Sequence, residues 1–227
     1  MNLLFVSATA QEINPFINHF NFDPSEVNTL EGKESCEISF LNTGPGLLAT
    51  AVNLAHHLTI HKYDLVVNAG ISGAFKHDVP KGTVFNVYRD TIADLGAEHA
   101  DGNFQNIFEI GLTDLNEFPY RGGWLYPIAC PIIIGLPLAS SVTVNKVTGS
   151  QTSIHQIYEK YQPDLESMEG AAVFYTCNMM NTPSFQIRSV SNYIEPRNKA
   201  NWNIPLAIKA LNDYLIEFIQ SIKKDDN

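Results

Sequence analysis

The sequence predicts a single α/β domain with a mixed, mostly parallel twisted sheet that helices flank on both sides. Short apolar and β-branched runs at residues 3–6, 65–68 and 185–190 are typical of strands covered on both faces. Helical patterns of apolar residues lie between them, at residues 12–20, 47–60, 169–180 and 205–222. Strands that alternate with helices favour parallel pairing through right-handed crossovers.

The length supports one domain, because 227 residues of which 44% are hydrophobic can bury one sizeable core. We expect this domain to span residues 1–222 and to be followed by a disordered tail at 223–227. Residues 83–91 form a further predicted strand, whereas residues 93–123 are polar and show no clear period. A loop of that length is typical of a functional lid or an insertion.

Composition argues against two classes of partner. The net charge is −10 and only 14 residues are Lys or Arg, so the chain lacks the clustered cations that hold a nucleic-acid backbone. No nucleic-acid partner is expected. The apolar stretch at residues 126–138 contains prolines and is too short to cross a bilayer, so no membrane partner is expected either.

The cysteines and histidines predict no metal site. Cys36, Cys130 and Cys177 are widely spaced and match neither a disulfide framework nor a zinc-ligand pattern, which fits a reducing cytoplasm. His56, His57 and His61 are expected on the helix that begins at Leu47, without a carboxylate at ligand spacing.

Two segments in the second half of the chain are the most informative for function. Ser-Met-Glu-Gly-Ala-Ala at residues 167–172 opens a predicted helix, and Arg-Ser-Val-Ser-Asn at 188–192 ends the next predicted strand. In α/β sheets ligands bind outside the carboxyl ends of strands, so these positions suit a site that grips a ribose and its base. Taken alone, Met168 could equally pack in the core, and Glu169 could be an acidic residue of the first helical turn.

With residues 193–198 and Trp202, these segments resemble the nucleoside phosphorylase and nucleosidase superfamily, and within it the hydrolases that cleave futalosine. The resemblance implies a nucleoside phosphorylase-like fold and a cofactor-free N-ribosyl hydrolase that is a homodimer and acts on a small-molecule nucleoside. It also implies that Glu169 accepts hydrogen bonds from the ribose 2′- and 3′-hydroxyls and that Met168 packs on the sugar. A carboxylate there would stabilise the positive charge that develops on the ribose.

Glu12 follows the first predicted strand. By spacing alone it is an acid at a helix N-terminus, where it favours the helix dipole. Nucleosidases carry at this place a Glu that orients and deprotonates the attacking water, so the resemblance implies that role. Phosphorylases instead hold phosphate here with glycine and arginine. Because the first arginine of the chain is Arg89, water is the expected nucleophile.

Two glycine-containing loops are expected near the nucleoside. Gly44 and Gly46 precede the helix predicted at 47–60, and Gly70, Ser72 and Gly73 follow the strand predicted at 65–68. Such glycines often mark only tight turns. The resemblance implies that the backbone of both loops approaches ribose and base. The second loop lacks the double glycine usual in the superfamily, which indicates altered ligand contacts.

Asn192 stands where the adenine-cleaving nucleosidases have Asp. Its NH₂ can donate to a 6-oxo oxygen while its carbonyl accepts N7–H, so a 6-oxopurine fits and a 6-amino group would meet a donor. Exchange of the amide O and N would weaken this discrimination. Thr143 and Val144 match a stretch that contacts the base in relatives, and the alternative for both is packing at a strand end.

The expected reaction releases hypoxanthine and dehypoxanthine futalosine from futalosine, a step of menaquinone biosynthesis. Arg197 and Arg121 are the available candidates for holding the carboxylate-bearing tail of that substrate. One alternative is a methylthioadenosine/S-adenosylhomocysteine nucleosidase, which Asn192 disfavours. Others are a purine nucleoside phosphorylase, disfavoured by the scarcity of arginine, and an inactive ligand-binding protein, disfavoured by the presence of Glu12 and Glu169.

Overall fold

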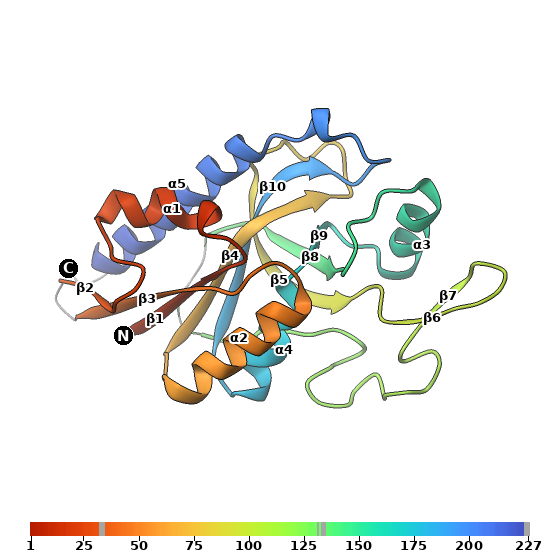
Figure 1. Cartoon of the computed structure of the whole chain (residues 1–227), viewed down its shortest axis with the longest axis horizontal. Coiled ribbons are helices and arrows are strands. Elements are labelled where there is room, and N and C mark those ends of the chain that lie inside the picture. The colour runs from red at the N-terminus through yellow and green to blue at the C-terminus, as the bar shows by residue number, and fades with distance from the viewer. Residues whose placement is uncertain (32–34, 131, 133–134, 225–227) are drawn as a thin grey trace.

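The computed structural model describes residues 1–31, 35–130, 132 and 135–224. Within this part of the chain the central sheet runs in the order β10, β5, β8, β9, β4, β1, β3, β2 (Figure 1). In chain order these strands are β1 (Asn2–Ser7), β2 (Asn28–Leu30), β3 (Cys36–Asn42), β4 (Leu65–Ala74), β5 (Val84–Ile92), β8 (Leu138–Thr143), β9 (Leu165–Ser167) and β10 (Ser184–Tyr193).

The shape of the sheet depends on β4, which pairs with three strands. It pairs in parallel with β1 and β10, and its last residues pair antiparallel with β9. Since β10 pairs with β5, β5 with β8, and β8 with β9, these five strands close a ring. The predicted α/β class is confirmed, but the sheet is mixed with a barrel-like closure and is not plainly mostly parallel. Continuous apolar runs report burial on both faces, and a barrel wall is buried in the same way as a parallel sheet.

Helices cover both faces of the sheet. Figure 1 shows α1 (Ala10–Phe20) and α5 (Ile204–Lys224) on one side and α2 (Leu47–Ile60) and α4 (Gly170–Met179) on the other. The four predicted helices are thereby confirmed to within about two residues at each end, as is usual for element boundaries. Lys223 and Lys224, which begin the predicted tail, belong to α5, and the rest of that tail lies outside the described residues.

The first strand shows why its sequence is continuously apolar. Leu3 and Phe5 point into the cluster beneath α1 and α5, whereas Leu4 and Val6 point into the cluster beneath α2 and α4. Successive strand side chains alternate between faces, so both sets are buried only when both faces are covered. β1 therefore runs between the two helix layers and ends at Ser7, shortly before α1 begins.

The predicted loop after residue 68 is wrong. Gly70, Ser72 and Gly73 lie inside β4, which continues to Ala74. A Cβ on Gly70 would lie 2.1 Å from Nη1 of Arg188, and a Cβ on Gly73 would lie 2.3 Å from Cδ1 of Ile194. These glycines therefore permit close approach of neighbouring side chains within a strand, which their sequence pattern did not distinguish from a turn.

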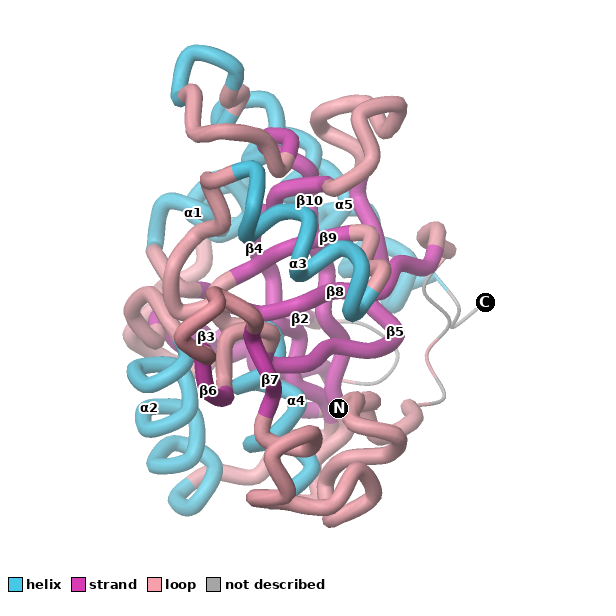
Figure 2. Tube along the Cα trace, turned by 90° about the vertical axis from the view of Figure 1, so that its right-hand side faces the viewer, coloured by secondary structure: helices cyan, strands magenta, loops and turns pink. Residues whose placement is uncertain are grey.

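The polar region at residues 93–123 contains a hairpin of β6 (Gly96–Glu98) and β7 (Phe104–Asn106). Figure 2 shows the hairpin near α3 (Gln151–Tyr161), a helix that the sequence analysis missed. Gln156 Nε2 donates to the carbonyl of Gly102 at 2.8 Å, and Lys160 Nζ donates to the carbonyl of Phe104 at 2.8 Å. In the described chain, none of the helices combines the length and apolar character needed to span a bilayer.

Candidate active site

Glu12 lies in the first turn of α1, and its two carboxylate oxygens accept hydrogen bonds from two different segments of the chain. Oε2 accepts hydrogen bonds from the backbone N–H of Thr9 at 3.0 Å and from its hydroxyl at 3.2 Å, which completes a capping box. Oε1 accepts from the N–H of Ile71 in β4 at 3.2 Å. The helix-end role suggested by the spacing is therefore present, and the second oxygen faces the central strand.

The buried position of Glu12 changes its acidity. Burial raises the pKa of Glu12, while the nearby Arg188 guanidinium and the two backbone donors lower it, and the Glu169 carboxylate raises it. The net direction is upward. A carboxylate with a raised pKa is a better base than an exposed one, because it holds a transferred proton more tightly.

A buried amide of α5 holds α1 in position. Asn212 of α5 accepts a hydrogen bond from the N–H of Phe16 at 2.8 Å and donates to the carbonyl of Glu12 at 2.8 Å. Asn212 is 1% exposed. Both bonds hold the backbone of α1, so they help to position the Glu12 carboxylate against β4.

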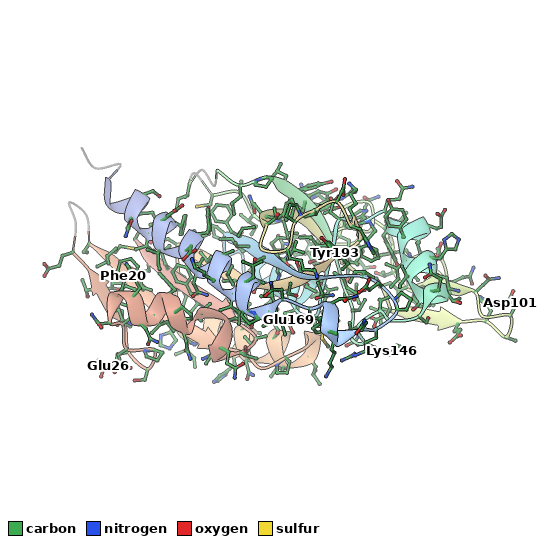
Figure 3. All side chains as sticks on the ribbon, turned by 90° about the horizontal axis from the view of Figure 1, so that it is seen from above. Phe20, Glu26, Asp101, Lys146, Glu169 and Tyr193 are labelled. Carbon is green, nitrogen blue, oxygen red and sulfur yellow. The ribbon has the colours of Figure 1, made fainter. Side chains whose placement is uncertain are left out.

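Glu169 is the N-cap residue of α4, immediately before the helix. Its Oε1 accepts a hydrogen bond from the N–H of Gly46 at 2.9 Å, which brings the loop before α2 against the start of α4. Gly44 and Gly46 have φ angles of +82° and +91°, a conformation that side-chain-bearing residues rarely adopt, so the turn role of these glycines is real. Met168 is half-buried beside Glu169. Figure 3 places Glu169 near the middle of the molecule.

Asn192 lies near the end of β10, just after an irregularity between Val190 and Asn192 that pairs it with Gly73. Its Oδ1 accepts from the Ser191 hydroxyl at 2.8 Å, and its Nδ2 donates to the Tyr193 carbonyl at 3.0 Å. These contacts define which way the amide faces. They leave one N–H and one oxygen lone pair of Asn192 available to a ligand.

The sequence analysis missed the polar residues that lie beneath these groups. Arg188 is 1% exposed, and its Nε donates to Gln186 Oε1 at 3.0 Å. Gln186 Nε2 in turn donates to Asp90 Oδ2 at 3.0 Å. The sequence pattern assigns no role to Arg188, Asp90 or Gln186. The available signal was the presence of polar residues within runs predicted to be buried, since such groups need partners.

Thr143 and Val144 are fully engaged within the protein. The Thr143 hydroxyl donates to Asp90 Oδ1 at 2.9 Å and accepts from the N–H of Ala171 at 2.8 Å. Val144 is 1% exposed and packs in a cluster with Ile194. Both side chains therefore match the strand-end packing alternative in this structure.

Arg197 and Arg121 are exposed and lie on different segments. The Arg197 guanidinium lies over the Trp202 ring at 5.6 Å, and the Arg121 guanidinium lies over the Tyr126 ring at 4.5 Å. No hydrogen bond or ion pair between described residues joins either arginine to the three site residues above. Across the same part of the chain, no cluster of His, Cys, Asp and Glu has the grouping that a metal ion needs.

Comparisons with known proteins place the fold of the chain in a family. The family model described as the phosphorylase superfamily matches residues 2–220. A futalosine hydrolase of Streptomyces coelicolor is 34% identical over 154 residues, which span 66% of this chain and 63% of that relative. The futalosine hydrolase of Thermus thermophilus is 25% identical over 216 residues, which span 92% of this chain and 91% of the relative.

Solved structures show the same fold at low sequence identity. The futalosine hydrolase of Helicobacter pylori superposes with a TM-score of 0.75 at 11% identity, covering 97% of this chain and 98% of that one. A methylthioadenosine/S-adenosylhomocysteine nucleosidase of Colwellia psychrerythraea in complex with adenine gives a TM-score of 0.76 at 15% identity, covering 98% and 96%. Because the family model accounts for nearly the whole sheet and its helices, the chain belongs to the phosphorylase superfamily.

Proposed function

We propose that this chain is a futalosine hydrolase, which cleaves the N-glycosidic bond of futalosine to release hypoxanthine and dehypoxanthine futalosine. The relatives that are named futalosine hydrolases support this assignment over most of the chain. The structural observation that carries it is the amide of Asn192, whose orientation is set by Ser191 and Tyr193. That orientation leaves a donor and an acceptor for the two edge atoms of a 6-oxopurine.

Glu12 is the proposed general base. Its pKa is raised by burial, and Arg188 lies close to it on the far side of Gly70. Nη2 of Arg188 has no hydrogen-bond partner among the described residues, so this guanidinium can donate to a water that Glu12 deprotonates. The water oxygen bonds to C1′ as the bond from C1′ to N9 of the purine breaks, and one water proton passes to Glu12. The purine leaves with the electron pair of that bond and takes a proton from solvent at N7.

Glu169 and Asn192 act on the two halves of the substrate that separate. Glu169 is 8% exposed, and a carboxylate in a buried position interacts strongly with the positive charge of an oxocarbenium-like ribose. Met168 packs on the sugar. Asn192 donates to O6 and accepts from N7–H, so the departing hypoxanthine keeps paired hydrogen bonds. Base contacts from the backbone at Thr143 and Val144, backbone contacts from Gly44, Gly46, Gly70, Ser72 and Gly73, and tail contacts from Arg197 and Arg121 belong to the same proposal.

The proposal includes a homodimer in the cytoplasm that serves menaquinone biosynthesis. Two neighbouring helices expose apolar side chains, with Leu48 and Val52 of α2 at 78% and 59% and Met179 of α4 at 53%. A second copy of the chain is the proposed cover, because exposed apolar surface favours association. The double variant Leu48→Lys/Val52→Lys should then be monomeric by light scattering, and an unchanged mass would exclude this surface.

One assay tests the reaction. Purified protein is incubated with futalosine, aminodeoxyfutalosine, methylthioadenosine and inosine, with and without phosphate, and the released base is identified. Hypoxanthine from futalosine at equal rates in both buffers is the expected result. Adenine from methylthioadenosine as the dominant product would favour the related nucleosidase, and a phosphate requirement with a ribose 1-phosphate product would favour a phosphorylase.

A further inference from the structure

A buried chain of hydrogen bonds runs from β5 to β10 beneath the site. Asp90 accepts from Gln186 Nε2 at 3.0 Å, and Gln186 Oε1 accepts from Arg188 Nε at 3.0 Å. Asp90 and Gln186 are 0% exposed and Arg188 is 1% exposed. The amide of Gln186 therefore links a buried carboxylate to a buried guanidinium without direct contact between the two charges.

Asp90 also holds the start of α4, the helix that Glu169 precedes. Its second oxygen accepts from the Thr143 hydroxyl at 2.9 Å, and that hydroxyl accepts from the N–H of Ala171 at 2.8 Å. Gly170 packs directly on the same network, since a Cβ there would lie 2.0 Å from Gln186 Oε1 and 2.3 Å from Asp90 Oδ2. One carboxylate thus connects β10, which carries Arg188, with the start of α4, which directly follows the proposed ribose ligand Glu169.

Arg188 and Glu12 approach each other without pairing. A Cβ on Gly70 would lie 2.1 Å from Arg188 Nη1 and 3.0 Å from Glu12 Oε1, so both atoms border the same space. Yet the two side chains form no ion pair within 4.0 Å in the described structure, whose salt bridges lie elsewhere. The bond from Arg188 Nε to Gln186 restrains the guanidinium on the side away from Glu12.

We propose that Asp90 is a positioning residue of the hydrolase, which through Gln186 holds Arg188 near Glu12 but unpaired and through Thr143 fixes the start of α4. This inference rests on the proposed function of the site. The charged groups that act on Glu12 are Arg188 from β10 and Glu169 from the start of α4, and the charged group that acts on Asp90 is Arg188. Asp90 therefore acts on Glu12 only through the arginine.

The physical reason is the choice of carboxylate that attracts the Arg188 guanidinium. A buried arginine needs a counter-charge, and without Asp90 the carboxylate that borders the same space as the guanidinium is that of Glu12. A direct ion pair would lower the pKa of Glu12 and leave it a weaker base. The network supplies the counter-charge from the opposite side, so Glu12 remains free to accept a proton from water.

The first test measures the acidity of Glu12 directly and needs no substrate. The side-chain carboxyl carbon of Glu12, labelled with ¹³C and assigned with Glu12→Gln, is titrated by NMR in the parent, in Asp90→Asn and in Gln186→Met. Both variants keep the volume of the side chain and remove part of the network. The pKa of Glu12 should fall by about one unit in each, the scale of a new neighbouring charge. An unchanged Glu12 pKa in both variants would overturn the proposal.

The matched control is Ile187→Val, because Ile187 lies between Gln186 and Arg188 and points into the core beneath α1 and α5. It should lower the melting temperature without moving the Glu12 titration. In kinetics, Asp90→Asn and Gln186→Met should reduce kcat about tenfold with KM nearly unchanged and move the acid limb of the pH profile to lower pH. If the parent releases no hypoxanthine from futalosine, the proposed function fails, and the NMR titration still decides the role of Asp90.

Discussion

The Glu12 carboxylate caps a helix and is also the proposed general base. Oε2 closes the capping box with Thr9, and Oε1 meets the N–H of Ile71 across the gap to β4. A residue used only as a helix cap would be exposed, as most capping acids are, whereas Glu12 is 8% exposed. Burial of a carboxylate is costly, and that cost raises its affinity for a proton, which is what a general base requires.

Glu12→Gln should separate the two duties. The amide can still accept from Thr9, but its NH₂ then faces the N–H of Ile71, so the free energy of unfolding should fall by about 1 kcal/mol. Turnover should fall on the order of a hundredfold with KM little changed, the usual scale for loss of a general base. Steady-state kinetics together with denaturant unfolding measure both quantities. Parent-like turnover would assign Glu12 to the helix end alone.

Asn192→Asp should change the preference for the base. The carboxylate lacks the donor that faces O6 and offers an acceptor to a 6-amino group, a change of roughly 1–3 kcal/mol for one mispaired buried group. The ratio of kcat/KM for futalosine over aminodeoxyfutalosine should therefore fall. The variant should also lose stability, because one oxygen would face the Tyr193 carbonyl that now accepts from Nδ2. A constant ratio would show that the base is read elsewhere.

At the scale of elements, β4 carries the site because it belongs both to the row of strands with β1 and β3 and to the ring that β10, β5, β8 and β9 close. Residues 65–68 of β4 pair with β1, and residues 66–74 pair with β10. In the second half of β4, beyond residue 68, β9 pairs with Gly73 and Ala74 and closes the ring with β10. The glycines of β4 lie in this second half. Each leaves room for a side chain from β10, so the pairing of β4 with β10 places Arg188 and Asn192 over positions without side chains.

Gly70→Ala tests that arrangement. Its Cβ would overlap Arg188 Nη1 at 2.1 Å and touch Glu12 Oε1 at 3.0 Å, and the guanidinium is the end of a flexible side chain that can move. We expect the chain to fold with a lower melting temperature and kcat to fall by at least tenfold, since misplacement of a catalytic group by about 1 Å is that costly. Gly111→Ala, on a surface turn with φ of +73°, is the control for a destabilised glycine site and should keep its kcat. Equal kcat values for both variants would contradict the assignment.

Periodicity predicted the elements whose own sequence shows a continuous apolar run or face. It failed for elements whose burial depends on strands that are distant in the sequence. The runs at β1 and α2 are long and apolar, so local pattern was sufficient. The strand β9 has three residues and includes Glu166 and Ser167, and it exists because β4 and β8 pair with it. The partners of Asp90 likewise depend on the register of β5 and β10, which no local pattern contains.

For the whole molecule, burial of Asp90 in its positioning role lowers the free energy of unfolding at neutral pH relative to acidic pH. Burial raises the pKa of Asp90 to about 6 from 3.8, although hydrogen bonds from Gln186 and Thr143 and the charge of Arg188 favour its ionised form. The folded chain therefore binds this proton more tightly than the unfolded chain. The stabilisation is fully present below the unfolded pKa and is lost as the pH rises through about 6.

Asp90→Asn should remove this pH dependence. From pH 4 to pH 7 the free energy of unfolding of the parent should fall, relative to that of the variant, by about 2 kcal/mol, because each unit of raised pKa is worth roughly 1.4 kcal/mol and part of the effect is already lost at pH 4. Denaturant unfolding of both proteins at several pH values gives the difference, in which contributions from other carboxylates cancel. Asp213→Asn, at a surface carboxylate of α5 that pairs with Lys209, controls for the generic effect of the substitution. A difference between parent and Asp90→Asn that stays constant with pH would show that Asp90 is not the buried acid that gains a proton below pH 6.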